Sequence, residues 1–353
     1  MTAALPEEMA HLRVLHFTDA YVGGVGSAID AYIAHTPDFD HFGLIDSRGA
    51  PLRIAPGFSR SARLQSSPAT WFRQLSSVVR NWEIDVIHAH SSRAGFVARS
   101  RNLGVPTVYS PHCFAFERLD ISRYTRWTFR MVEAQLAPRT TVLAACSLGE
   151  RAIASDMGFP RTTYIPNVSS QEFEYCEDQP SQGAGNHVCS VGRISPQKGP
   201  EFFSAVSTLA GPAAAIDFTW VGGGGAAAES SLIAAGASVT GWLSRGEVSN
   251  RLAQATVYLH CAAWEGFPIS ILEAVSLGRP VVARKISAMM GMPRRWLAED
   301  PRQALRLIGE LIQDAGLREQ NVREWTVALA ANSSGAQRDA LYHTYRIALG
   351  ESE

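Results

Sequence analysis

The sequence predicts an α/β protein with two doubly wound parallel sheets, one in each half of the chain. Three observations support this prediction. The chain has 353 residues, which is long for a single hydrophobic core. Short apolar runs alternate with helical stretches in both halves, as they do in parallel sheets. A polar, acidic segment at residues 171–186 separates the two series and is the best linker candidate.

The first series predicts an N-terminal Rossmann-like domain over residues 1–170. An apolar run at 12–18 leads into a glycine-rich turn and then a helical pattern, so the chain begins strand–loop–helix. Further short apolar runs follow, and helical stretches separate several of them. These further predicted strands lie at residues 41–46, 85–90, 106–110, 141–146 and 162–167.

The second series predicts a C-terminal Rossmann-like domain over residues 187–334. Amphipathic spacing at 336–349 indicates one more helix, and we expect residues 335–353 to pack back on the N-terminal domain. Ligands of such sheets bind outside the carboxyl ends of the strands, so we expect the two domains to face each other across a cleft that holds the site. The predicted strands of this domain lie at residues 187–194, 215–224, 238–243, 256–262 and 280–285.

The composition narrows the classes of partner. The net charge is −1, so the chain has no overall attraction to nucleic acid, and any anion site must be local. Of the 32 basic residues only two are lysines, Lys198 and Lys285, which makes the position of each lysine informative.

The cysteines and the N-terminus predict a cytoplasmic protein. The five cysteines are scattered and never have C-x-x-C spacing, so we expect reduced thiols, without a disulfide framework or a zinc site. The first residues include acids where a signal peptide needs a basic flank. No run approaches the ~18 apolar residues of a membrane-spanning helix.

The stretch VGRISPQKG, residues 191–199, is the strongest candidate for a phosphate site. It follows a strand, places Arg193 and Lys198 five residues apart, and ends at Gly199, where a helix begins. A planar guanidinium and a flexible ammonium together suit a diphosphate. A solvated loop is the alternative, but one of only two lysines falls here, so we favour phosphate binding.

The stretch WEGFPISILEAVSLGRP, residues 264–280, sets two glutamates eight residues apart. Pro268 suits the first position of a helix and Gly278 suits its end. Glu265 is then expected on the loop before the helix and Glu273 one to two turns inside it. Between them lie the unpaired backbone N–H groups of a helix N-terminus, which bind anions. The stretch therefore predicts a site for a ligand that carries both phosphates and hydroxyl groups.

Three features of the N-terminal half each leave two interpretations. Glycines after the first strand, Gly24 and Gly26 among them, allow a ligand to approach the backbone, but the G-G-x-G spacing fits a plain tight turn equally well. His112 follows a strand end and is either structural or functional. His88 and His90 face one side of a strand, but no carboxylate or cysteine at ligand spacing accompanies them, so we expect no metal there.

Residues 116–135 mix four arginines with aromatic side chains. A basic, aromatic helix can rest on an anionic membrane surface. The alternative is a helix that packs its apolar stripe on the sheet. We favour packing and keep peripheral contact with the inner face of an anionic membrane open.

Together these residues resemble the retaining glycosyltransferases of family 4, the group 1 glycosyltransferases, which have the GT-B fold. The resemblance spans most of the chain, from the glycines of the first loop to the helix before Pro280. GRISPQKG is similar to the family's G-R-x-x-x-x-K-G, and EGFPISILEA is similar to its E-x7-E motif. The resemblance implies that residues 187–334 bind the donor and that residues 1–170 form the acceptor side.

The resemblance also implies a role for each matching residue. Arg193 and Lys198 would hold the donor diphosphate and neutralise the leaving group. Glu273 would accept hydrogen bonds from the ribose, while Glu265 and His112 would lie near the transferred sugar. The other expected donor contacts are two glycines of the first loop, two base-pocket residues and four residues around the start of the helix: Gly24, Gly26, Trp242, Leu243, Gly266, Phe267, Pro268 and Ile269.

The implied activity is transfer of a sugar from a nucleoside-diphosphate sugar, with UDP or GDP favoured, to a saccharide or lipid-linked acceptor. Retention of configuration, no metal and no cofactor are implied as well, in bacterial surface polysaccharide or glycolipid synthesis. Two alternatives stay open: a sugar-nucleotide epimerase or hydrolase on the same fold, and a non-catalytic protein that binds sugar nucleotides. Two departures from the family pattern, VGGGG at 221–225 and SAMMGMPRR after Pro280, leave the donor open.

Overall fold

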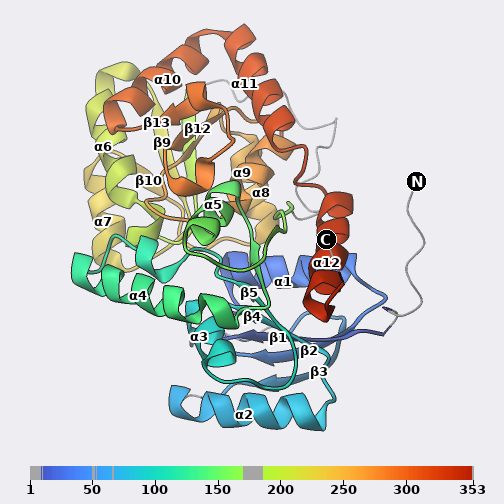
Figure 1. Ribbon diagram of the computed structural model, residues 1–353. Helices are drawn as coiled ribbons and strands as arrows, with labels where there is room; N and C mark the ends of the chain where they lie inside the picture. Colours follow the sequence, from blue (N-terminus) through green and yellow to red (C-terminus); the bar gives the residue numbers. More distant parts are fainter. Residues whose placement is uncertain are drawn as a thin grey trace. The chain divides into compact units, whose positions relative to one another are not determined.

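The computed structural model describes residues 9, 11–49, 52, 54–65, 67–169 and 186–351. The chain forms two compact units (Figure 1). The first unit comprises Met1–Glu117, Ser122–Val168 and Ser333–Glu353, and the second comprises Arg118–Ile121 and Ser169–Asn332. The predicted linker at 171–186 lies outside the described residues except for Asn186.

The first unit is built on a seven-stranded sheet in the order β3-β2-β1-β4-β5-β6-β7. All of its strand pairs are parallel, and the order reverses between β1 and β4. The central strands are buried on both faces, which explains why they appear in the sequence as continuous apolar runs. The strands are β1 (Arg13–Thr18), β2 (Asp40–Ile45), β3 (Phe58–Arg63), β4 (Val86–His90), β5 (Thr107–Ser110), β6 (Val142–Ala145) and β7 (Thr162–Tyr164).

Helices cover both faces of this sheet. On one face α1 (Gly23–His35) and α12 (Ser334–Leu349) share a hydrophobic core with β1, β4, β5 and β6. On the other face α2 (Pro68–Asn81) and α3 (Ser92–Ser100) pack on β1, β2 and β4. The unit also contains α5 (Leu148–Asp156) and two short 3-10 helices, η2 (Ala115–Glu117) and η3 (Ala137–Arg139).

Strand β3 was not predicted from the sequence. Its residues, FSRSAR, are mostly exposed or half-buried, because β3 lies at the edge of the sheet and has a partner on one side only. An edge strand carries charged side chains where a central strand needs apolar ones, so the apolar-run criterion misses it.

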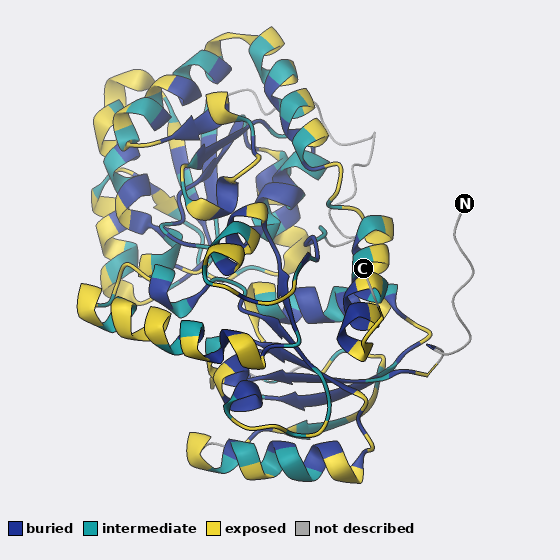
Figure 2. Ribbon diagram, viewed as in Figure 1, coloured by how far each residue is buried: buried dark blue, intermediate teal, exposed yellow. Residues whose placement is uncertain are grey.

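The packing interpretation of residues 116–135 is wrong. Helix α4 (Arg123–Leu136) buries only Glu133 and Leu136, and Figure 2 shows it largely exposed. Its large apolar side chains remain in solvent, with Tyr124 76% and Trp127 58% exposed. A buried polar contact holds this helix instead: Glu133 accepts hydrogen bonds from Arg99 at 2.8 Å and from Tyr109 at 2.9 Å.

The second unit is built on a six-stranded sheet in the order β10-β9-β8-β11-β12-β13. Its strand pairs are also parallel, and the order again reverses at the centre, between β8 and β11. The prediction of two doubly wound parallel sheets is therefore confirmed. The strands are β8 (His187–Val191), β9 (Asp217–Val221), β10 (Ser238–Val239), β11 (Val257–His260), β12 (Val281–Arg284) and β13 (Leu297–Ala298).

Large aromatic side chains fill the core of the second unit. Phe203 and Trp220 pack edge to face with ring centroids 5.4 Å apart. The buried amide of Asn321 bonds to both backbone groups of Val281, and this contact ties α11 to β12. The helices are α6 (Pro200–Ala210), α7 (Ala226–Ala234), α8 (Arg245–Ala253), α9 (Ile269–Ser276), α10 (Pro301–Gln313) and α11 (Ala315–Ala328), with short 3-10 helices η5 (Pro196–Lys198), η6 (Pro212–Ala214), η7 (Ser287–Met289) and η8 (Arg294–Trp296).

Within the described part of the chain, none of the helices combines the length and the apolar character needed to cross a membrane.

Candidate functional site

Each sheet has a switch point, where the loops after two central strands run in opposite directions and leave a crevice. In the second unit this point lies at the carboxyl ends of β8 and β11, and in the first unit at those of β1 and β4. Most of the residues singled out from the sequence lie on the loops and helix ends that follow these strands.

The loop after β8 carries Arg193 and Lys198. Gly192 stands at φ 143°, and a Cβ there would lie 3.3 Å from Lys198 Cε, so the aliphatic stem of Lys198 packs over Gly192. Arg193 is exposed, and its guanidinium has no hydrogen bond or ion pair among the described residues. The loop therefore presents one cation held by protein contacts, Lys198, and one exposed cation, Arg193.

Contacts with the end of β11 fasten this loop. Gly199 adopts the left-handed conformation, φ 67°, and a Cβ at this position would lie 2.2 Å from the carbonyl oxygen of Cys261. Only glycine fits such an approach without a shift of the backbone. The N–H of Ala263 donates to the carbonyl of Gln197 at 2.8 Å. The two loops that flank the switch point are thus joined through their backbones.

An ion pair spans this switch point. Lys198 Nζ pairs with Glu265 Oε1, and Gln197 Nε2 donates to Glu265 Oε2 at 3.5 Å. The Lys198 side chain is 26% exposed and that of Glu265 is 11% exposed. The structure therefore brings together two of the residues proposed to act on the donor, although 67 residues separate them in the chain.

Helix α9 follows the predicted layout with one correction. Pro268 is the N-cap, not the first helical residue, because its ψ of 115° keeps it extended. Gly278 closes the helix as predicted, with φ 66° and its N–H bonded to the carbonyl of Val275 at 2.9 Å. No side chain caps the N-terminus. The first-turn amides of α9, around Ile269, therefore remain available to an anion.

The two glutamates lie where the sequence predicts. Glu265 is on the loop before α9, with Gly266 and Phe267 after it, and Glu273 is in the second turn of the helix. Burial raises the pKa of Glu273 to about 7, and the positive charges of Arg245 and Lys198 oppose the shift. A carboxyl group in this state changes protonation near neutral pH.

The sequence analysis missed His260, the last residue of β11. Burial and then the charge of Lys198 lower its pKa, so the ring is neutral. Its Nδ1 lies 3.2 Å from the hydroxyl of Tyr258, which donates to Ser270 in the first turn of α9. Its Nε2 is buried and has no hydrogen-bond partner among the described residues. A polar residue at the end of an apolar strand is the signal that could have found it.

The glycine run after β9 has a packing reason. A Cβ at Gly222 would lie 2.2 Å from the carbonyl oxygen of Gly192, and one at Gly223 would lie 2.9 Å from the ring of Trp242. Trp242 thus rests against glycine backbone and stays 70% exposed, while Leu243 is half-buried. An exposed aromatic ring on a rigid support suits stacking against a planar ligand.

The glycines of the first unit lie inside a helix, and the prediction that they form the turn before it is wrong. Gly24 and Gly26 belong to the first turn of α1, and only Gly23 there has positive φ, 56°. A Cβ at Gly24 would meet nothing within 4 Å. Val22 caps the helix without a side-chain bond. Because these glycines have no side chains, a ligand can approach the N-terminus of α1 closely.

A buried carboxylate spans the switch point of the first unit. Asp19 follows β1, and its side chain is 3% exposed. Ser91, which follows β4, donates to Asp19 Oδ1 at 2.6 Å, and Arg48 pairs with Oδ2 at 2.9 Å. Ser91 has φ 90°, a costly conformation for a residue other than glycine. The sequence analysis did not identify this pair, because neither residue belongs to a recognisable motif.

His112 lies on a strained turn after β5. Both His112, φ 52°, and Cys113, φ 92°, are in the left-handed region. The buried carboxyl of Glu150 holds this turn, since it accepts from the N–H of Cys113 at 2.7 Å and from that of Cys146 at 2.8 Å. Burial lowers the pKa of His112 to about 4. Strain of this kind is characteristic of functional positions, and it favours a functional role for His112.

The two histidines of β4, His88 and His90, belong to a larger group of histidines. His88 and His90 lie beside His16 of β1, and one ring nitrogen from each lies within 4.8 Å of the others, a spacing that a metal ion could use. His90 also bonds to His112, with Nδ1 and Nε2 3.0 Å apart. Strand alternation alone did not show that these rings meet.

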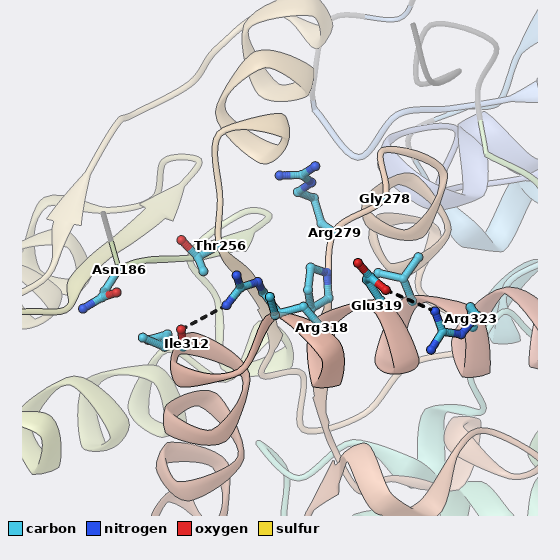
Figure 3. A pocket seen from close by; sticks show the side chains of 11 residues that line it. Asn186, Thr256, Gly278, Arg279, Ile312, Arg318, Glu319 and Arg323 are labelled. Atoms are coloured by element: carbon cyan, nitrogen blue, oxygen red, sulfur yellow. Dashed lines mark hydrogen bonds and ion pairs between the residues drawn. The ribbon is translucent and has the colours of Figure 1, made fainter. Parts of the chain in front are cut away.

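One further pocket lies in the second unit, away from its switch point. It has a volume of about 500 Å³, and its lining includes Thr256 and Pro280, which precede β11 and β12. Figure 3 shows Arg318 in it, reaching the carbonyl of Ile312 at 3.0 Å. None of the residues predicted to bind the donor or to act in catalysis lines this pocket. It lies at the amino ends of the strands, where sheets of this type do not bind their substrates.

Comparison with known protein families gives one match for each half of the chain. Residues 5–168 match the model of the glycosyl transferase 4-like domain. Residues 185–314 match that of the glycosyl transferases group 1.

Two curated proteins are similar in sequence. A Klebsiella pneumoniae protein, described as an uncharacterized 41.2 kDa protein in the cps region, is 24% identical over 296 residues, 79% of this chain and 82% of its own. The Escherichia coli UDP-Gal:alpha-D-GlcNAc-diphosphoundecaprenol alpha-1,3-galactosyltransferase is 26% identical over 238 residues, 60% of this chain and 61% of its own.

Solved structures with the same fold include HepE from Anabaena in complex with UDP. HepE is 16% identical, with a TM-score of 0.75 over 94% of this chain and 99% of its own. WaaG, a glycosyltransferase involved in lipopolysaccharide biosynthesis, is 15% identical, with a TM-score of 0.69 over 96% of this chain and 100% of its own. At these identities the likeness concerns the fold.

Proposed function

Since this chain belongs to a GT-B glycosyltransferase family, we propose that it is a retaining, metal-independent enzyme of family 4. In this proposal it transfers a sugar from a nucleoside-diphosphate sugar to a saccharide or lipid-linked acceptor. The observation that supports the proposal most is the Lys198–Glu265 pair, which lies across the switch point of the second unit beside the uncapped N-terminus of α9.

The diphosphate site of this proposal combines three positive features. Lys198 supplies a placed ammonium, Arg193 an exposed guanidinium, and α9 the backbone amides at the start of its first turn, around Ile269. Glu265 holds Lys198 in position before the donor binds. As the bond between sugar and phosphate breaks, negative charge grows on the leaving diphosphate, and these groups stabilise that charge. No step of this scheme calls for a metal ion.

The remaining proposed donor contacts concern the ribose and the base of the nucleotide. Glu273, half-buried in α9, accepts hydrogen bonds from the ribose, and its pKa near 7 makes this binding sensitive to pH. Trp242 offers its exposed ring to the base. UDP is the favoured carrier, because HepE binds UDP and the similar galactosyltransferase uses UDP-Gal. GDP is the second choice.

The proposed acceptor is a saccharide or lipid-linked saccharide of a bacterial surface polysaccharide or glycolipid. Two relatives support this class: one is described as a protein of a cps region, and another acts on a diphosphoundecaprenol-linked sugar. We propose that the enzyme is cytoplasmic and works at the inner face of the membrane. Helix α4 suits such contact, because Tyr124 and Trp127 are exposed next to the basic Arg123.

A donor panel and an acceptor requirement test the proposal. The thermal stability of the protein is measured with UDP, GDP, ADP, TDP and CMP species, since a ligand at 100 times its Kd stabilises by about 2.7 kcal/mol. The stabilising nucleotide, supplied as its sugar, is then incubated with and without lipid-linked acceptor. Transfer that requires acceptor supports the proposal. Conversion of the sugar nucleotide without acceptor indicates an epimerase or hydrolase, and binding without turnover indicates a non-catalytic protein.

A further inference from the structure

A continuous hydrogen-bonded chain of four imidazole rings runs through the first unit and ends at His112. His41 Nδ1 lies 3.0 Å from His16 Nε2, His16 Nδ1 lies 3.1 Å from His90 Nε2, and His90 Nδ1 lies 3.0 Å from His112 Nε2. His16, His41 and His90 are buried. These rings come from β1, β2 and β4, and His112 follows β5.

The far end of this chain fixes the direction of every bond in it. His41 Nε2 lies 3.0 Å from the carbonyl oxygen of Thr36, which can only accept. The hydroxyl of Thr36 also lies 3.0 Å from this nitrogen, but its proton is donated to the carbonyl of Tyr32 at 2.7 Å, so it too can only accept. His41 Nε2 therefore carries a proton.

The protonation state of each ring follows from the one before it. Burial lowers the pKa of all four imidazoles, so each ring is neutral, with one N–H and one bare nitrogen. Because His41 Nε2 holds the proton, His41 Nδ1 accepts from His16 Nε2–H. By the same step His16 Nδ1 accepts from His90 Nε2–H, and His90 Nδ1 accepts from His112 Nε2–H. His112 is left with a bare Nδ1.

We propose that His41, His16 and His90 are positioning residues that hold His112 in its Nε2–H tautomer, so that Nδ1 serves as a hydrogen-bond acceptor for a hydroxyl group of the bound sugar. Among the described residues His112 Nδ1 has no hydrogen-bond partner, and the ring is half-buried. The recognition of a sugar hydroxyl rests on the proposed function, whereas the tautomer does not. Because the chain ends at a backbone carbonyl, it orients His112 but does not conduct a proton away from it.

The hydrogen bonds argue against a metal ion in the same cluster. His88 uses both ring nitrogens, with Nδ1 2.9 Å from the hydroxyl of Tyr345 and Nε2 2.9 Å from that of Ser110. A metal held by His16, His88 and His90 would need the lone pairs that these bonds occupy. His88 is off the chain although it lies beside His90, with ring centroids 4.1 Å apart, and this makes it a matched control.

The test is long-range 15N–1H NMR of the full chain labelled in histidine, without nucleotide. We expect His112 to show one protonated nitrogen, Nε2, and to share a coupling across the hydrogen bond with His90 Nδ1. Further couplings should join His90 to His16 and His16 to His41. Protonation of His112 at Nδ1, or absence of these couplings, overturns the proposal. Zinc binding that removes the proton from His90 Nε2 overturns it as well.

Two variants of His41 separate positioning from structure. His41→Gln keeps an acceptor toward His16 and a donor toward Thr36, so His112 should remain a single tautomer. His41→Leu removes both, and the 15N shifts of His112 should move toward a tautomeric mixture, with kcat/KM lower by about tenfold, the loss expected for one hydrogen bond. The control His88→Leu should lower the melting temperature without changing the tautomer of His112.

The outcomes distinguish the two proposals. If His41→Leu folds and the His112 spectrum is unchanged, the proposed role of the histidine chain in positioning His112 is overturned. If this variant does not fold, the tautomer of His112 in the unmodified protein tests the proposal. If His112 has the predicted tautomer but the protein has no transferase activity, the positioning role of the histidine chain stands and the proposed function is overturned. If the protein transfers sugar but His112 is protonated at Nδ1, the proposed function stands and the positioning role is overturned.

Discussion

The sheets of the two units have the same strand order apart from β7, an extra edge strand in the first unit, but their switch points use polar side chains differently. In the first unit Asp19, Ser91 and the three histidines that precede His112 in the chain of rings are buried and bonded to other groups of the protein. In the second unit Lys198 is partly exposed and Arg193 is exposed. The first arrangement holds side chains in one geometry, while the second offers charge to a ligand. The same topology therefore supports two tasks, and burial decides which.

The largest expected effect concerns ion pairs in the two units. Glu133→Ala should lower the free energy of unfolding by about 3–5 kcal/mol, because it leaves the fully buried Arg99 without its partner. The exposed pair of the second unit, Lys285 with Glu299, is the control, and Lys285→Ala should cost about 0–1 kcal/mol. Denaturant unfolding of both variants measures the contrast, and equal losses would contradict it.

Next come the cations proposed to bind the diphosphate. Lys198→Ala and Arg193→Ala should each weaken nucleoside-diphosphate binding by about 1.5–3 kcal/mol, the value of a charge-assisted hydrogen bond, and lower turnover as well. Titration calorimetry measures the affinity, and Lys285→Ala serves as the matched lysine control. Unchanged affinity in both folded variants would refute the assignment.

Substitution of Glu265 and of Glu273 should change the kinetics of transfer in different ways. Glu273→Gln weakens the proposed contact with the ribose, which should be equal in ground and transition states, so the donor KM should rise more than kcat falls. Glu265→Gln removes a charge that we propose lies beside the reacting sugar, but its amide oxygen can still accept from Lys198. We therefore expect kcat to fall by about 10- to 100-fold while diphosphate affinity holds. Steady-state kinetics of both variants, side by side, measure the split. Identical or reversed profiles would show that the division is wrong.

The pKa of Glu273 predicts how stability depends on pH. Because its folded pKa of about 7 lies above the usual 4.5, the native state binds more protons than the unfolded state between these values. The contribution of Glu273 to the free energy of unfolding therefore falls as pH rises through this window. At pH 8 the free energy of unfolding of Glu273→Gln should exceed that of the unsubstituted protein by about 1–2 kcal/mol, after allowance for partial solvation. At pH 4 the two free energies should differ little. Unfolding curves at both pH values test this, and a gain at pH 4 alone would contradict it.

The smallest expected effect is that of a chelator. Because the proposed mechanism neutralises the leaving diphosphate with positive side chains and helix amides, EDTA should leave transferase activity within experimental error of the untreated enzyme. Activity that is lost on chelation and restored by Mg²⁺ or Mn²⁺ would overturn this prediction. Such a loss would place the metal at the phosphates or at the cluster of His16, His88 and His90.

The sequence alone determined the two alternating series of strands and helices, since apolar runs and helical periods report local backbone preference and burial. It also indicated the ends of α9 and the loop of Arg193 and Lys198, because proline, glycine and rare lysines carry local information. It missed β3, whose edge position leaves it polar, and it misjudged α4, which a buried ion pair holds in place of an apolar stripe.

Only the tertiary structure decided which polar groups meet. His16, His41 and His90 are separated by 25 to 74 residues along the chain, and the order of β1, β2 and β4 in the sheet places their rings in one line. Lys198 and Glu265 meet for the same reason, through β8 and β11. Sheet order and register are set by the packing of the whole unit, and a local pattern of residues does not encode them.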